Sequence, residues 1–261
     1  IDLYYECHGE GEPLMLIAGL ASDSQSWLPV LGELSRDFLV IIVDNRGTGR
    51  TTPSHAETSI QHIADDCIAL IRYLGLPSVT LLGHSMGGFV ALDCTIRHPE
   101  LVSRLILAAT SALSCERNSA LFRDWVFYQN TEMTPEHWFR NVFYWIFSRK
   151  FFESEQVVAE AVRAATEYPY PQSASAFAKQ VQAIEAFDCR SKLSEIKQNV
   201  LIICATDDLL FPPDESIEVL QAIPTTRTAL IEGAAHSVHM EAAAKFTASV
   251  SGFIGDHTGR P

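Results

Sequence analysis

The sequence predicts an α/β fold: a mostly parallel, doubly wound sheet with helices on both faces and a helical cap inserted near the middle of the chain. Two observations support this prediction. Short apolar runs alternate with amphipathic helical patterns, as they do where each strand is followed by a helix. The alternation stops between Ala109 and Val200, a stretch far longer than a crossover between neighbouring strands needs.

Six short runs are the predicted strands, and helical patterns lie between them. Each run is strongly apolar and bounded by polar residues or glycine, which is typical of strands buried on both faces of a parallel sheet. Pro213 at the start of one helical pattern and Gly75 after the end of another are residues that helices favour at those places. The predicted strands are residues 14–18, 39–43, 79–82, 105–109, 200–204 and 228–231, and the predicted helices are residues 59–74, 88–98, 213–222 and 241–254.

The long interval divides the predicted domain into three parts. Residues 1–111 and 196–261 form the core, and residues 112–195, which show helical patterns throughout, form the cap. The cap holds 16 of the 25 aromatic residues of the chain, enough for a small core of its own and for the wall of an apolar pocket. The candidates for the pocket wall are Trp125, Tyr128 and Trp145.

Composition and charge argue against two classes of partner. Acidic residues outnumber basic ones by 32 to 19, which gives a formal net charge of −13. A chain with this charge and no cluster of Lys or Arg repels the phosphates of nucleic acids and anionic lipid surfaces. No segment has 18 consecutive apolar residues, the length that a membrane-spanning helix needs. We therefore expect neither nucleic acid nor a membrane as a partner.

The pattern of cysteines and the N-terminal residues of the sequence indicate the cellular compartment. The six cysteines are scattered and include no C-x-x-C pair, as in proteins whose thiols stay reduced. The first residues lack the basic and apolar regions of a secretory signal. We therefore expect a cytoplasmic protein.

The stretch from Gly83 to Gly87 carries the strongest chemical signal. Its sequence, Gly-His-Ser-Met-Gly, lies between a predicted strand and a predicted helix, which is the context of a G-x-S-x-G nucleophile elbow. Small residues beside the serine allow a tight turn that lifts the hydroxyl above the sheet edge and points the start of the helix at it. Ser85 is therefore the candidate nucleophile.

A serine nucleophile needs a base and a third group that orients the base. Two adjacent acids, Asp207 and Asp208, follow the fifth predicted strand, and two histidines, His236 and His239, follow the sixth. Residues beyond the carboxyl ends of parallel strands lie at the same sheet edge as Ser85. The order serine, acid, histidine is the one expected for an elbow of this kind.

With these motifs the chain resembles the α/β-hydrolase superfamily over essentially its full length. Within that superfamily it resembles the esterase and lactonase group that includes the 3-oxoadipate enol-lactonase-like proteins. The matching segments are residues 18–20, 44–49, 83–88, 208–212 and 233–236.

The resemblance selects between the paired candidates. The family commonly has a proline four residues after the acid, which fits Asp208 with Pro212, so Asp208 is the expected acid. The family's G-x-x-H pattern fits Gly233 with His236, so His236 is the expected base and His239 is expected to begin the last helix.

Acyl transfer also requires hydrogen-bond donors for the developing oxyanion. One expected donor is the backbone N–H of Met86, directly after the candidate nucleophile. The resemblance implies that the other comes from the loop after the first predicted strand, where the family usually has His-Gly-x. This chain has Ala18-Gly19-Leu20, so the Leu20 N–H is the expected donor although the customary histidine is absent.

The 44–49 segment resembles the family's Asp-x-Arg-Gly-x-Gly loop and is expected to be mainly structural. Its glycines allow a turn, and Arg46 is expected to hold the loop by charge-assisted hydrogen bonds. Asn45 and Gly19 are further candidates for the pocket.

The chain is therefore expected to be a serine hydrolase that cleaves a small carboxylic ester or lactone through an acyl-enzyme. A largely apolar or weakly charged substrate suits a negatively charged chain with no basic cluster in its cap. No cofactor is expected. The stretch from His236 to Glu241 lacks the H-E-x-x-H pattern, so no metal is expected either.

Two other interpretations stay open. Relatives with the same triad hydrolyse carbon–carbon bonds or act as cofactor-free perhydrolases, because fold alone does not determine function. Other relatives with intact triads are small-molecule receptors or signalling partners with little turnover. The sequence makes no prediction of oligomeric state.

Overall fold

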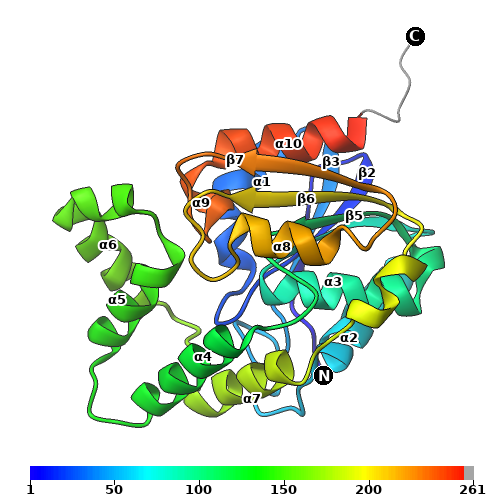
Figure 1. Cartoon of the computed structure of the whole chain (residues 1–261). Helices are drawn as coiled ribbons and strands as arrows, with labels where there is room; N and C mark the ends of the chain where they lie inside the picture. The colour runs from blue at the N-terminus through cyan, green and yellow to red at the C-terminus, as the bar shows by residue number, and fades with distance from the viewer. Residues whose placement is uncertain (256–261) are drawn as a thin grey trace.

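In the described part of the chain, the sheet has seven strands and is parallel except at one edge. In the computed structural model, which describes residues 1–255, the strands lie in the order β1-β3-β2-β4-β5-β6-β7 (Figure 1). Among these seven, β1 alone runs antiparallel to its neighbour. The strands are β1 Tyr5–His8, β2 Glu12–Ile17, β3 Phe38–Val43, β4 Val79–His84, β5 Val102–Ala108, β6 Asn199–Ala205 and β7 Thr226–Ile231. The predicted α/β class is confirmed.

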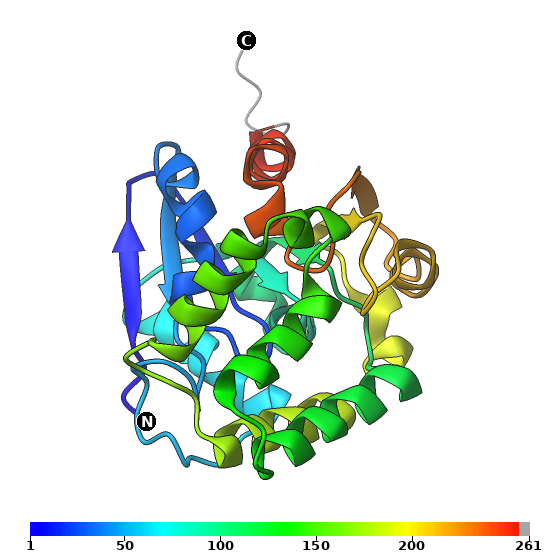
Figure 2. The ribbon, with the colours of Figure 1, turned by 90° about the vertical axis from the view of Figure 1, so that its left-hand side faces the viewer.

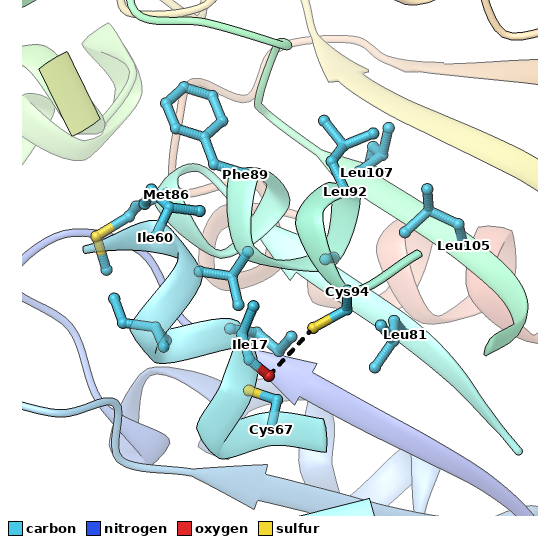
Figure 3. Close-up of a cluster of buried hydrophobic side chains, with 14 of the residues drawn as sticks. Ile17, Ile60, Cys67, Leu81, Met86, Phe89, Leu92, Cys94, Leu105 and Leu107 are labelled. Carbon is cyan, nitrogen blue, oxygen red and sulfur yellow. Dashed lines mark hydrogen bonds between the residues drawn. The ribbon is translucent and has the colours of Figure 1, made fainter. Parts of the chain in front are cut away.

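Helices cover both faces of the sheet, because successive side chains of a strand point to opposite faces. The helices that belong to the sheet layers are α1 Leu28–Leu34, α2 Ile60–Tyr73, α3 Met86–Arg97, α8 Pro213–Leu220, α9 Val238–Glu241 and α10 Ala243–Gly255. In β2, Leu14 and Leu16 pack in one core with α1 and α10, whereas Met15 and Ile17 pack in the other with α2 and α3. Figure 3 shows part of this second core, where side chains of α2, α3 and β5 pack together.

Four further α-helices lie between β5 and β6, and we call them the β5–β6 helices: α4 Glu116–Gln129, α5 Pro135–Ile146, α6 Glu155–Thr166 and α7 Ala174–Glu185. Contacts join α4 to α7 and α5 to α6. Figure 2 shows these helices in front of the sheet. The two ends of the segment that contains these helices lie side by side, where the Cys189 N–H donates to the Ala112 carbonyl at 3.1 Å. In the described part of the chain, no helix combines the length and apolar character that crossing a membrane requires.

Candidate active site

Ser85 lies at a strained turn between β4 and α3. Its φ of 54° and ψ of −121° are a conformation that residues other than glycine rarely adopt. The Ser85 N–H donates to the Ala108 carbonyl at 3.0 Å, and the Ser85 carbonyl accepts from the Gly88 N–H at 2.8 Å and the Thr110 hydroxyl at 2.7 Å. These bonds from neighbouring elements hold the strained backbone in place.

The turn also requires glycine at position 87. A Cβ on Gly87 would lie well under 3.0 Å from the backbone carbonyl of Ile17 in β2, which cannot move aside without disturbing the sheet. We expect Gly87→Ala to lower the free energy of unfolding by about 3 kcal/mol, measured by urea denaturation. As a control, Gly252→Ala in α10, whose Cβ would meet no atom within 4 Å, should raise stability by about 0.5 kcal/mol. Equal stability of G87A and the unsubstituted protein would contradict the clash.

Asp208 and His236 meet beyond the carboxyl ends of β6 and β7. His236 Nδ1 lies 3.0 Å from Asp208 Oδ2, and the two residues are only 4% and 3% exposed. The other carboxylate oxygen, Oδ1, accepts the N–H groups of Leu210 at 2.8 Å and Phe211 at 2.9 Å. These two hydrogen bonds fix the rotation of the carboxyl group. Asp207, by contrast, is exposed and accepts from the neighbouring Thr206 hydroxyl.

The buried ring of His84 lies against both His236 and His239. The ring centroid of His84 is 4.8 Å from that of His236 and 4.5 Å from that of His239. Burial and the two neighbouring histidines hold the pKa of His84 well below its usual range, and burial with His236 lowers the pKa of His239 to about 3. His84 Nε2 lies 2.8 Å from the His236 carbonyl oxygen, which can only accept, so Nε2 of the neutral His84 carries the proton.

The loop after β2 packs directly against Ser85. A Cβ added to Gly19 would be 3.0 Å from the Ser85 Cβ, so the Gly19–Leu20 backbone runs beside the serine. Met86 begins α3, and the first N–H groups of a helix have no partner within the helix. The Leu20 and Met86 N–H groups therefore belong to the two segments that flank Ser85.

The other pocket candidates have different surroundings. Asn45 is buried and donates its side-chain amide to the Ala18 carbonyl at 3.0 Å. Trp125 is 3% exposed and donates its ring N–H to the Asn141 side chain at 2.9 Å. This N–H is therefore already hydrogen-bonded within the β5–β6 helices. Tyr128 and Trp145 are partly buried against the larger core. That they line a pocket stays a prediction.

The expected role of Arg46 in the 44–49 segment is confirmed. Its guanidinium donates to both carboxylate oxygens of Asp66, each at 2.7 Å. Within residues 1–255, no three His, Cys, Asp or Glu side chains are grouped closely enough to hold a metal ion.

Comparison with known proteins identifies the family of the chain. The family model described as alpha/beta hydrolase fold matches residues 12–243. The chain belongs to this family. It is 26% identical to a putative carbamate hydrolase RutD from Agrobacterium fabrum over 255 residues, which cover 91% of this chain and 92% of that protein.

Two solved structures resemble this α/β hydrolase over nearly its whole length. The enol-lactonase from Burkholderia xenovorans has a TM-score of 0.86 and 27% identity, with 97% of this chain and 96% of that chain covered. The putative non-heme bromoperoxidase BpoC from Mycobacterium tuberculosis has a TM-score of 0.89 and 26% identity, with 98% of this chain and 96% of that chain covered. The resemblance to an α/β hydrolase of the esterase and lactonase type, inferred from the sequence motifs, is confirmed.

Sequence reasoning missed two polar residues of the α/β hydrolase that contact the loops of the site. Gln180 of α7 is fully buried, accepts the Ala21 N–H at 3.5 Å and donates to the Arg46 carbonyl at 3.2 Å. Glu241 of α9 accepts the Ala235 N–H, directly before His236, at 2.8 Å. A Gln in a helix and a Glu five residues after a histidine carry no local signal of these contacts.

Proposed function

We propose that this α/β hydrolase is a serine hydrolase that cleaves a small carboxylic ester or lactone. The observation that carries the proposal is the buried Asp208–His236 pair, 3.0 Å apart, at the same sheet edge as the strained turn that presents Ser85. A buried carboxylate that orients an imidazole beside a serine is the arrangement that makes a hydroxyl nucleophilic. The similarity to an enol-lactonase supports a carbonyl substrate.

The proposed reaction has two halves. Ser85 Oγ attacks the carbonyl carbon while His236 Nε2 takes the hydroxyl proton, and Asp208 accepts the Nδ1–H and stabilises the imidazolium. The backbone N–H groups of Leu20 and Met86 bind the oxyanion. The tetrahedral intermediate then breaks its ester C–O bond, and the departing alkoxide takes the proton from His236. Water, deprotonated by His236, then attacks the acyl carbon; the bond from that carbon to Ser85 Oγ breaks, His236 returns the proton to Ser85 Oγ, and the acid is released.

A fluorophosphonate tests the nucleophile directly. The reagent phosphonylates an activated serine and loses fluoride, so we expect a single adduct in the intact mass, mapped by peptide sequencing to the segment that contains Ser85. Prior denaturation should abolish the adduct, because activation depends on the folded site. A folded protein that forms no adduct, or forms it elsewhere, would contradict the proposed role of Ser85.

The substrate class requires a panel under steady-state conditions. We expect continuous turnover of short aryl esters or of lactones. A carbamate belongs in the panel because of the name of the RutD relative, and peracid formation from acetate and hydrogen peroxide belongs there because of the bromoperoxidase relative. A ring-cleavage dienoate tests carbon–carbon bond hydrolysis. Tight stoichiometric binding of a panel compound without turnover would favour a receptor instead.

A further inference from the structure

The backbone around His236 is held by a hydrogen bond at each of three consecutive residues. The Ala235 N–H donates to Glu241 Oε2 at 2.8 Å, and the Ser237 N–H donates to the Ile146 carbonyl at 2.8 Å. The His236 carbonyl accepts from His84 Nε2 at 2.8 Å. The peptide that carries the imidazole is therefore tied to α9, to the end of α5 and to the turn before Ser85.

Glu241 connects this loop to the β5–β6 helices through its second oxygen. Glu241 Oε1 accepts both the backbone N–H of Ser148 at 3.0 Å and its hydroxyl at 2.7 Å. Ser148 lies just after α5 and is only 4% exposed. One carboxylate thus accepts three hydrogen bonds, two from the segment after α5 and one from the residue before His236.

The donors of Ser148 and Ala235 are all satisfied only if both terminal side-chain atoms of residue 241 are hydrogen-bond acceptors. An amide at position 241 keeps one oxygen, which Ser148 attracts more strongly because it offers two donors. The amide NH₂ then faces the Ala235 N–H, where two donors meet and no hydrogen bond forms. Glu241→Gln therefore breaks the link to the histidine loop while the contact with Ser148 remains.

We propose that Glu241 is a positioning residue for His236. Through its hydrogen bonds, the position of α5 affects the orientation of the base. The proposal rests on the proposed function, in which His236 is that base. Glu241 touches no reacting atom in this scheme and acts through the Ala235 peptide. A base displaced by a fraction of an ångström transfers the proton poorly, and a misplacement of about 1 Å costs on the order of 100-fold in rate.

The test compares Glu241→Gln, Ser148→Ala and their combination with a matched control, Glu218→Gln, whose carboxylate is exposed on α8. We expect E241Q to lower kcat by about 10- to 100-fold with KM changed less than about twofold, because substrate binding does not need the proton transfer. E218Q should behave like the unsubstituted enzyme. Rates are given per active site titrated with the fluorophosphonate, so that unfolded protein does not contribute.

The double variant tests the coupling. S148A alone loses the hydroxyl bond and keeps the N–H bond, so we expect kcat to fall by about two- to fivefold. In the E241Q background the link to the histidine loop is already broken, so S148A should lower kcat no further. Independent, multiplying effects of S148A and E241Q would overturn the coupling.

Proton NMR of the His236 Nδ1–H separates this proposal from the proposed function. The resonance, assigned by its loss in His236→Gln, should shift in E241Q and stay in place in E218Q. An enzyme that turns over but shows normal kcat and an unshifted resonance in E241Q would overturn the positioning role alone. A fall in activity that disappears once rates are expressed per titrated site would overturn it too. Absence of labelling and turnover in the unsubstituted protein would overturn the proposed function, and this proposal with it.

Discussion

Replacing Ser85 with alanine should lower kcat for an aryl ester by on the order of 10⁶-fold. Alanine removes the only atom that can form the acyl-enzyme and leaves the oxyanion donors and the pocket in place. The backbone turn should persist, because its bonds to Ala108, Gly88 and Thr110 involve the Ser85 backbone. Thermal unfolding of S85A should therefore differ little from that of the unsubstituted enzyme.

Ser103→Ala is the matched control for this substitution. Ser103 is an exposed serine of β5, at the end of the strand far from Ala108. Its replacement should change kcat by less than about twofold, since surface substitutions away from a site have small effects. Retention by S85A of more than about 1% of the kcat, in a preparation shown by mass to lack the unsubstituted protein, would contradict the nucleophile.

Replacing Asp208 with asparagine should lower kcat by about 10⁴-fold. That magnitude is known for the equivalent substitution in another serine hydrolase, and this structure supplies a reason to expect it here. The N–H groups of Leu210 and Phe211 donate to Oδ1, so an asparagine keeps its oxygen at that position. Its NH₂ then points at His236 Nδ1 and donates to it. The ring proton is forced to Nε2, the atom that must accept the proton of Ser85.

Asp207→Asn makes the same chemical change at the neighbouring residue. Asp207 is exposed and its side chain accepts only from Thr206 among the hydrogen bonds described, so we expect kcat to stay within about twofold of normal. Measuring both variants on the same ester, with the fluorophosphonate rate as a second readout, separates orientation of the base from a change of local charge. A large loss in D207N with a small loss in D208N would reverse the assignment of the acid.

The sequence predicted the fold class because its signals are local. Buried parallel strands are short apolar runs, and each of the six predicted runs overlaps a strand of the structure, two of them extending one residue beyond it. The strand Tyr5–His8 was missed because it is a half-buried edge strand of mixed polarity, and α1 was missed because it has only seven residues. The glycine-rich turn at Ser85 was recognisable because close backbone packing restricts which residues can flank it.

The contacts that surround the candidate site are not local and could not be predicted in this way. Ser148 and Glu241 are 93 positions apart in the chain and meet only because α5 packs against the loop after β7. Gln180 likewise reaches two loops that precede it by more than a hundred residues. Each is a common polar residue without a local sequence motif, so its partners are known only when the tertiary packing is known.

The adjacency of β5 and β6 has a consequence for the segment that connects them. Leu105 lies opposite Val200 in the parallel pair, so the chain leaves the sheet at the carboxyl end of β5 and re-enters it at the amino end of the neighbouring strand β6. The register of β5 with β6 does not depend on the length of the segment that connects them. Closing a longer loop costs little additional entropy. The pairing of β5 with β6 therefore sets no upper limit on the length of the segment between them. That segment is constrained instead by its contacts with the rest of the chain, such as those of Ser148 with Glu241.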